Sequence, residues 1–267
     1  MLLTICMSTI LDKILADKFI EVAERKLSVS INDLEKLPAF SRSCLSMKQS
    51  LLTSNTGIIS EFKRKSPSKG WIHENANVVD ITSGYSKAGA SGISILTDFA
   101  YFGGSNQDIV DARPLITCPV LRKEFVIDEY QIYEAKALGA DVILLIAAAL
   151  TIKETLEFAR KAHELGLEVL LEVHNTDELR HTNDYVDMLG VNNRNLKTFE
   201  VNTNVSFELA DLIPDNIVKV SESGISNAET VIKLRRVGYK GFLMGENFMK
   251  EMNPAETLKR FIGELKG

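Results

Sequence analysis

The side chains most suited to chemistry follow an apolar run in the stretch 58–70, which reads IISEFKRKSPSKG. The run suits a strand buried on both faces, and it gives way at once to a carboxylate, cations and hydroxyls. Side chains alternate along a strand, so Glu61 and Lys63 point to the same side, opposite to Ile58. Such a pair suits proton transfer or anion binding. The alternative is a solvated basic loop with one surface ion pair.

Polar side chains also follow most other apolar runs. They occur at Thr97-Asp98, Arg122-Lys123-Glu124, Glu172, Asn192-Asn193-Arg194, Ser221-Glu222-Ser223-Gly224 and Gly245-Glu246-Asn247. Any one of them is as easily explained by loop solvation. Their repetition indicates a common mouth if the strands are parallel, because the carboxyl ends of such strands meet at one rim. The run at 142–146 is the exception, since small residues follow it and leave room for a ring.

The elements that would position these residues alternate regularly. Apolar, strand-like runs occur at 57–62, 92–96, 120–122, 142–146, 168–171, 188–191, 217–220 and 242–244. Segments with helical periodicity lie at 127–138, 152–165, 205–212, 227–237 and 254–265. Helix-ending glycines precede several strands, at Gly89, Gly139, Gly166 and Gly238. This alternation implies parallel βαβ units, and eight strands predict an α/β fold, the TIM (β/α)8 barrel. The alternative is an open doubly wound sheet, but no GxGxxG follows the first run.

A helical extension precedes the first predicted strand. Apolar residues at 10, 11, 14, 15, 19 and 22 predict a helix over 8–25, with Ser8 or Thr9 as its N-cap. A weaker helix over 30–37 ends at Pro38, and 41–50 is a further helical candidate. We expect residues 1–50 to form an extension that packs on the barrel mouth, and residues 51–267 to form the catalytic barrel. The apolar start of the chain resembles neither a signal peptide nor a membrane span, and Met7 is an alternative translation start.

Composition excludes several classes of function. The chain has 267 residues, 45% hydrophobic and 25% charged, enough for one large core. Its 31 Lys and Arg against 36 Asp and Glu give a net charge of -5, so no basic field attracts nucleic acid or an anionic membrane. The three cysteines, Cys6, Cys44 and Cys118, fit no CxxC pattern, which argues against a disulfide framework or a zinc site. A reducing, cytoplasmic location fits best.

Two loops at the predicted mouth suit a phosphate group. Ser223 and Gly224 precede a helix that Ser226 or Asn227 can cap, so N–H groups and the helix dipole would face an anion there. Gly245 follows the last strand and lets the backbone approach a ligand closely. Phosphate sites after the seventh and eighth strands recur in TIM barrels. The sequence therefore predicts a small phosphate-bearing ligand.

Five motifs, in order, resemble the indole-3-glycerol phosphate synthase family. They are SEFKRKSPS at 60–68, PVLRKEF at 119–125, LEVH at 171–174, GVNNRNL at 190–196 and SESGI at 221–225. The resemblance runs from about residue 10 to the C-terminus and includes the helical extension. It implies an enzyme of tryptophan biosynthesis that uses no metal and no cofactor. Such an enzyme converts the sugar phosphate 1-(2-carboxyphenylamino)-1-deoxyribulose 5-phosphate into indole-3-glycerol phosphate, carbon dioxide and water.

The chemistry of that reaction suggests roles for the charged residues. Ring closure needs an acid on the ketone oxygen, and we expect Lys123 to supply it, with a pKa lowered by burial and by neighbouring cations. The final loss of water needs a base, Glu172, and an acid, which is either Lys63 or Lys123. The resemblance supports these three residues as catalytic. Glu61 and Glu222 would hold the lysines and balance their charge.

The resemblance also implies the remaining members of the site. They are Ser66, Phe125, Asn192, Arg194, Ser223, Gly224, Gly245 and Glu246. Arg194 has the planar fork of donors that suits the substrate carboxylate. Phe125 is expected to be a wall for the anthranilate ring, and Phe102 is either a second wall or core. Glu246 stands where the family commonly has a small hydroxyl residue, so its carboxylate should face away from the phosphate. His174 is interpreted as structural.

Two other functions would fit parts of the sequence. A phosphoribosylanthranilate isomerase is a phosphate-binding barrel, but such enzymes lack the helical extension and usually use an Asp/Cys pair, for which Cys118 is badly placed. A non-catalytic subunit would bind a sugar phosphate without turnover, but Lys63, Lys123 and Glu172 argue against it. We expect a small-molecule sugar-phosphate substrate, no nucleic-acid or membrane partner, and a monomer.

Overall fold

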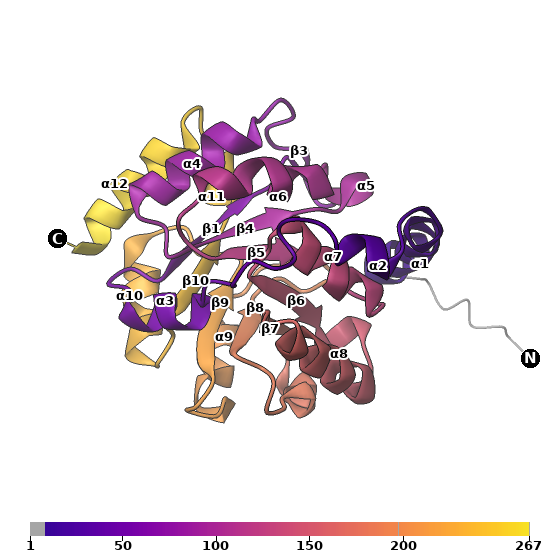
Figure 1. The fold of residues 1–267 in the computed structure, drawn as a ribbon. Helices are drawn as coiled ribbons and strands as arrows, with labels where there is room; N and C mark the ends of the chain where they lie inside the picture. Colours follow the sequence, from indigo (N-terminus) through magenta and orange to yellow (C-terminus); the bar gives the residue numbers. More distant parts are fainter. Residues whose placement is uncertain (1–8, 197, 267) are drawn as a thin grey trace, which may run out of the picture.

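Eight parallel strands close into a barrel in the structure, a computed structural model that describes residues 9–196 and 198–266 (Figure 1). The barrel strands are β1 (Ile58–Phe62), β4 (Gly92–Leu96), β5 (Val120–Lys123), β6 (Val142–Ile146), β7 (Glu168–Val173), β8 (Met188–Asn192), β9 (Val218–Glu222) and β10 (Gly241–Met244). Strand β1 pairs in parallel with both β4 and β10 and so closes the ring. The predicted TIM barrel is confirmed, and each predicted strand lies within two residues of its observed bounds.

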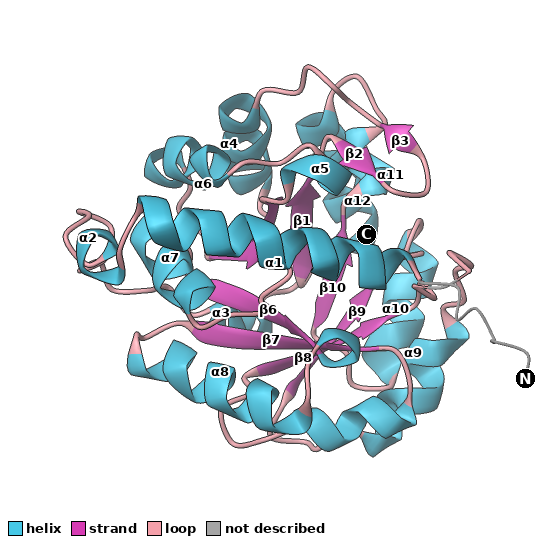
Figure 2. Cartoon of the chain, turned by 90° about the vertical axis from the view of Figure 1, so that its right-hand side faces the viewer, coloured by secondary structure: helices cyan, strands magenta, loops and turns pink. Residues whose placement is uncertain are grey.

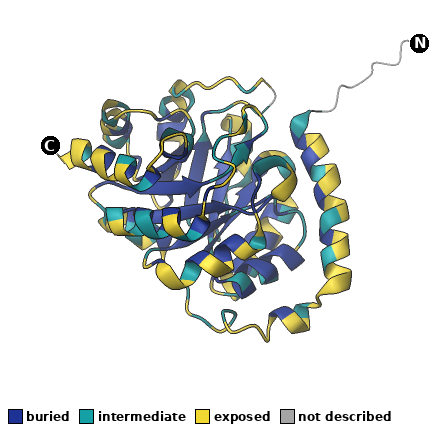
Figure 3. Ribbon diagram, turned by 90° about the horizontal axis from the view of Figure 1, so that it is seen from above, coloured by how far each residue is buried: buried dark blue, intermediate teal, exposed yellow. Residues whose placement is uncertain are grey.

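Apolar side chains form an inner core inside the barrel, an outer core between the barrel and its helices, and a smaller cluster that joins Val22 and Leu34 of the extension to Tyr130. Ile59, Leu121 and Leu144 belong to the inner core, whereas Ile58 belongs to the outer one. This alternation follows from the strand period of two. It places Glu61 on the inner side, opposite to Ile58, as predicted. Figure 3 shows the strands as a buried centre.

Helices surround the barrel. Those that alternate with the barrel strands are α4 (Val78–Ala88), α6 (Asn106–Ala112), α7 (Tyr130–Leu138), α8 (Ile152–Glu164), α9 (Asn204–Leu209), α10 (Ala228–Arg236) and α12 (Pro254–Lys266). The glycines that were predicted to end helices, Gly89, Gly139, Gly166 and Gly238, have φ between 75° and 96°. Few residues other than glycine adopt such angles, so the prediction is confirmed. Within the described residues, no helix is both long and apolar enough to cross a membrane.

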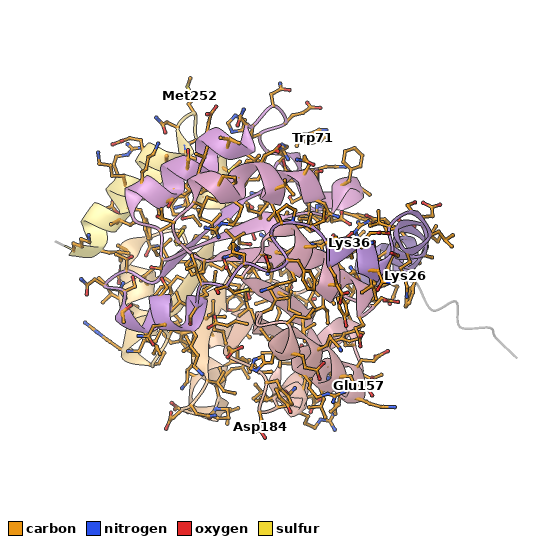
Figure 4. All side chains as sticks on the ribbon, viewed as in Figure 1. Lys26, Lys36, Trp71, Glu157, Asp184 and Met252 are labelled. Atoms are coloured by element: carbon orange, nitrogen blue, oxygen red, sulfur yellow. The ribbon has the colours of Figure 1, made fainter. Side chains whose placement is uncertain are left out.

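Short elements at the mouth were not predicted. They are the hairpin strands β2 (Lys65–Ser66) and β3 (Gly70–Trp71) and the helices α5 (Phe99–Phe102) and α11 (Glu246–Met249). A periodicity argument needs a longer window than these elements offer. The hairpin follows β1 directly, and its Trp71 lies at the periphery of the molecule (Figure 4).

The first helix of the extension lies over the open end of the barrel (Figure 2). Helix α1 (Ile10–Ser28) begins after Thr9, which forms a reciprocal capping box with Asp12. Thr9 is therefore the N-cap. The other candidate, Ser8, lies outside the described residues, as do Cys6 and the alternative start at Met7.

The rest of the extension leads to the opposite end of the barrel. Helix α2 (Ile31–Leu34) is shorter than predicted. Helix α3 (Met47–Thr53) begins later than the helix predicted over 41–50, and its Met47 and Leu51 join the inner core. Glu168 accepts a hydrogen bond from the Met47 N–H at 2.8 Å. Nearby, Cys44 is a free thiol, as is Cys118.

Candidate active site

A cavity of about 470 Å³ opens at the carboxyl ends of the barrel strands. Every residue that the sequence analysis assigned to the site lines it: Glu61, Lys63, Ser66, Lys123, Phe125, Glu172, Asn192, Arg194, Glu222, Ser223, Gly224, Gly245 and Glu246. The volume falls in the range of roughly 300–1,000 Å³ that is usual for small-molecule pockets. The barrel topology therefore brings side chains from distant parts of the sequence to one small site.

Lys123 contacts two buried carboxylates. Its Nζ lies 2.8 Å from Glu172 Oε2 and 2.5 Å from Glu222 Oε2. Burial alone would lower the pKa of Lys123, but the charges of Glu172, Glu222 and Glu61 outweigh burial and raise that pKa above the usual lysine value. The expectation of a lowered pKa was wrong, because carboxylates rather than cations surround the ammonium group. Lys123 is therefore charged at neutral pH.

The two carboxylates on Lys123 differ in their other partners. Glu172 accepts a hydrogen bond from Asn192 Nδ2 at 3.0 Å, and His174 Nε2 lies 3.3 Å from its Oε1. Burial would raise the pKa of Glu172, but the charge of Lys123 and the contact with His174 lower it below its usual value. Burial raises the pKa of Glu222 to about 7, because the charge of Lys123, which lowers this pKa, is too weak to cancel the effect of burial. Glu172 is therefore the more strongly ionised of the two.

Glu61 and Lys63 form a second ion pair in the cavity. Lys63 Nζ lies 2.8 Å from Glu61 Oε1, as expected for side chains on the same side of a strand. Gly245 makes room for this pair, because a Cβ at that position would lie 2.6 Å from Glu61 Oε1. The sequence predicted that a ligand would approach the backbone at Gly245 closely. In the structure, the Glu61 carboxylate makes a close approach there.

The cationic side chains of the loop after β1 fall into two groups, those that anchor the loop and those that line the cavity. Arg64 donates to the two oxygens of Asp108 at 2.7 and 2.9 Å, and Lys65 donates to a backbone carbonyl of α5 at 2.9 Å. These two anchor the loop. Lys63 and Lys69 line the cavity instead, together with Ser66, whose buried Oγ has no hydrogen-bond partner among the described residues. The basic stretch is therefore neither a purely solvated loop nor entirely part of the site.

The loop after β9 has an unusual backbone conformation. Ser223 and Gly224 both have positive φ, at 65° and 74°. This region is unfavourable for serine, so neighbouring contacts must stabilise it. Asn193, which is buried, donates from Nδ2 to the Ser223 carbonyl at 3.0 Å. Asn227 then caps α10, as one of the two predicted candidates.

Arg194 and Glu246 lie together at the rim of the cavity. Arg194 Nη2 is 3.8 Å from Glu246 Oε2, and Lys69 Nζ is 2.5 Å from Glu246 Oε1. Burial would raise the pKa of Glu246, but Lys69, Lys63 and Arg194 lower it. The expectation that this carboxylate faces away was wrong, because it lies among cations that would attract an anion.

Apolar residues line the remaining walls. The rings of Phe102 and Phe125 have centroids 6.1 Å apart, and both line the cavity. Helix α1 contributes Ile10, Leu11 and Ile14. The sequence indicated that the extension adds groups to the mouth but not which ones. The apolar stripe of the helix, to which these three residues belong, could have identified them as the face turned toward the barrel.

The fold and the site together define a class of protein. A closed barrel of eight parallel strands with a charged cavity at their carboxyl ends is the arrangement of a TIM-barrel enzyme. Solved structures agree on the fold. A chain of the tryptophan synthase α2β2 complex and a mutant tryptophan synthase α-subunit, both from Pyrococcus furiosus, match with TM-scores of 0.59 and 0.58. They are 18% and 19% identical, and each match covers 79% of this chain and 98% of the other.

Sequence comparisons identify the family within that class. The profile of the family "Indole-3-glycerol phosphate synthase" matches residues 11–261. An indole-3-glycerol phosphate synthase from Bacteroides thetaiotaomicron is 52% identical over 256 residues, which are 96% of this chain and 98% of the relative. One from Polynucleobacter asymbioticus is 44% identical over 266 residues, covering 96% and 100%. The chain belongs to the indole-3-glycerol phosphate synthase family.

Proposed function

We propose that this chain closes the indole ring of 1-(2-carboxyphenylamino)-1-deoxyribulose 5-phosphate, with loss of carbon dioxide and water, in tryptophan biosynthesis. The observation that carries the proposal is the contact of Lys123 with Glu172 and Glu222 inside the cavity. A proton donor, a proton acceptor and an aromatic wall thus lie within reach of one small molecule. The family to which the chain belongs has this activity by name.

In the first half of the reaction, Lys123 acts on the ketone oxygen. The ring carbon that bears the carboxylate attacks the ketone carbon, and the ketone oxygen takes a proton from the lysine. Carbon dioxide then leaves, and the electrons of the broken bond return to the ring and restore its aromaticity. The former ketone oxygen remains as a hydroxyl on the new ring. The raised pKa of Lys123 keeps its proton available until negative charge develops on that oxygen.

In the second half, the hydroxyl leaves as water. Glu172 takes a proton from the neighbouring carbon, while Lys63 or Lys123 gives one to the departing oxygen. The lowered pKa of Glu172 keeps its carboxylate ionised and able to accept a proton at neutral pH, although it also makes the carboxylate a weaker base. Glu61 holds Lys63 in the cavity, and Glu222 holds Lys123.

Binding roles follow from position in the cavity. Arg194 suits the substrate carboxylate, and Phe125 with Phe102 suits the anthranilate ring. The backbone around Ser223 and Gly224 suits the phosphate, with Ser66 near the polar end. Gly245 and Glu246 belong to the same proposed phosphate site through their backbone, whereas the nearby carboxylates of Glu61 and Glu246 oppose an anion. Asn192 links the catalytic residues to the binding residues, because its Nδ2 donates to Glu172 and its Oδ1 accepts from the Arg194 N–H at 3.0 Å.

We further propose a division of the chain into a helical extension, residues 1–50, and a catalytic barrel, residues 51–267. The cavity residues contributed by α1 support an active role for the extension. A monomer in the cytoplasm is the simplest form consistent with free Cys44 and Cys118 and with one complete cavity in one chain.

A fluorescence assay tests the proposed function. Purified protein mixed with the anilino ribulose phosphate should generate the fluorescence of the indole product. Glu172→Gln should reduce kcat by a factor of about 10² to 10⁴, because it removes the base and leaves the shape of the side chain. Binding of the substrate in a calorimetric titration, with no product from the parent protein, would favour the non-catalytic subunit instead.

A further inference from the structure

His174 lies beside the proposed base but has no role in the chemistry above. Its imidazole lies between two carboxylates: Nε2 is 3.3 Å from Glu172 Oε1, and Nδ1 is 3.1 Å from Glu178 Oε2. The side chain is only 12% exposed, and Nε2 has no hydrogen-bond partner among the described residues, so its contact with Glu172 is one of charge and distance. A ring that faces a carboxylate with each nitrogen is most stable with a proton on both, which is the imidazolium ion.

The segment after β7 is folded around the Glu178 carboxylate. Asn175 caps the short 3₁₀ helix Thr176–His181 by accepting from the Glu178 N–H at 3.2 Å. Asn175 Nδ2 also donates to Glu178 Oε1 at 2.7 Å, and the His174 N–H donates to Glu178 Oε2 at 2.8 Å. These contacts fix the carboxylate against the ring. Glu178 is therefore held in place as the counter-ion of His174.

The two glutamates on Lys123 compete for ionisation. Both are buried, both contact the same ammonium group, and burial disfavours the charge of each. Among the described residues, a second cation, His174, lies beside Glu172, whereas Glu222 pairs with Lys123 alone. We propose that His174 is a positioning residue, an imidazolium held by Glu178, which makes Glu172 rather than Glu222 the ionised carboxylate on Lys123. The catalytic consequence rests on the proposed function, whereas the charge arrangement does not.

The pKa shifts in the cluster agree with this geometry. Burial would lower the pKa of His174, but its contacts with Glu172 and Glu178 raise it to about 10. His174 in turn lowers the pKa of Glu172, whereas burial raises that of Glu222 to about 7. The other charged groups that face the cluster are Lys123 from β5 and Glu61 from β1. Lys123 is shared by both glutamates and Asn192 is neutral, so His174 supplies the additional positive charge on Glu172, while burial and, to a lesser degree, Glu61 raise the pKa of Glu222.

Nuclear magnetic resonance of the ¹⁵N-labelled full chain tests the charge of the ring without any substrate. The chain has 4 histidines, and the signal that is absent in His174→Gln identifies His174. We expect both ring nitrogens to report the imidazolium form from about pH 6 to 8, where an ordinary histidine loses its proton. In Glu178→Gln the same ring should lose its proton at a lower pH. A neutral ring in the parent protein at about pH 7.5 would overturn the proposal.

The pH dependence of kcat tests the consequence for Glu172. His174→Gln keeps a donor but removes the charge, so the pKa of Glu172 should rise. Activity that needs ionised Glu172 is then lost at a higher pH than in the parent. We expect the acid limb of the profile to move upward by about one unit or more, with activity recovered toward alkaline pH. His163→Gln, a half-exposed histidine paired with Asp187, is the matched control and should leave the limb in place.

The outcomes separate the two proposals. A uniform loss of kcat in His174→Gln with an unmoved acid limb would indicate a purely structural role and contradict the inference. If the parent protein makes no product, the synthase proposal fails, and the charge of the ring still decides the inference about His174.

Discussion

At the scale of residues, the ammonium group of Lys123 is charged before any substrate binds, because two carboxylates contact it. A lysine with a raised pKa gives its proton reluctantly to a neutral ketone. It stabilises an oxygen on which negative charge is developing, which is where electrostatic catalysis is strongest. We therefore expect proton transfer to accompany ring closure rather than to precede it.

A second expectation at this scale concerns the rim of the cavity. Glu246→Gln should lower KM for the phosphate-bearing substrate, because the carboxylate competes with an anion for Arg194 and Lys69. Like charges about 4 Å apart repel by roughly 1 kcal/mol in water, which corresponds to a fall in KM of about fivefold. Steady-state fluorescence assays measure KM, and the gain should shrink at high salt.

The control for this variant is Glu251→Gln, which removes the same charge from an exposed residue just beyond α11. It should leave KM nearly unchanged. A higher KM in Glu246→Gln would mean that the carboxylate orders the first loop through Lys69, so that losing it harms binding.

At the scale of elements, buried charge joins α1 to the barrel. Lys18 Nζ is 2.9 Å from Asp98 Oδ2 and 3.0 Å from Glu124 Oε1, and all three side chains are at most 2% exposed. Asp98 and Glu124 follow β4 and β5, so the cluster ties the extension to the strand that carries Lys123. In sequence, Lys18 looks like an interruption of the apolar stripe of α1. In the structure it belongs to the buried face.

Lys18→Met should destabilise the protein strongly. It leaves two buried carboxylates without their shared partner, and breaking a buried ion pair typically costs about 3–5 kcal/mol. Urea unfolding followed by circular dichroism measures the change in unfolding free energy.

Lys26→Met on the same helix is the matched control. Lys26 projects from the end of α1 (Figure 4) and pairs with Asp128 with 46% of its side chain exposed. Exposed pairs contribute less than about 1 kcal/mol. Equal losses in the two variants would contradict the anchoring role of Lys18.

For the whole molecule, the sequence was most informative where a local hydrophobic pattern determines the type of secondary structure. Continuous apolar runs between helical segments predicted the eight strands, and the barrel topology then placed Glu61, Lys123 and Glu172 at one rim. The orientation of Glu246 and the surroundings of Lys123 were predicted wrongly. Both depend on which side chains from different strands contact one another across the barrel, and no local sequence pattern encodes such contacts.

The two ends of the barrel also differ in what they contribute. At the end opposite the cavity, fully buried Asp141 accepts from Arg42 Nη2 at 2.6 Å and from Arg113 Nη1 at 2.8 Å. Asp141→Ala should lower the unfolding free energy by about 3 kcal/mol or more, because two arginines lose their partner. The kcat of the folded fraction should stay within about twofold, since catalysis belongs to the other end. A tenfold lower kcat in fully folded protein would contradict this division.

The turnover number kcat of Lys123→Met for the anilino ribulose phosphate tests the proposed role of Lys123 most directly. We predict a loss of at least about 10²-fold in a variant that keeps the parent's circular dichroism. Lys65→Met, which removes a lysine that does not line the cavity, should remain active. A Lys123→Met protein that forms the indole product at nearly the parental rate would contradict a catalytic role for Lys123.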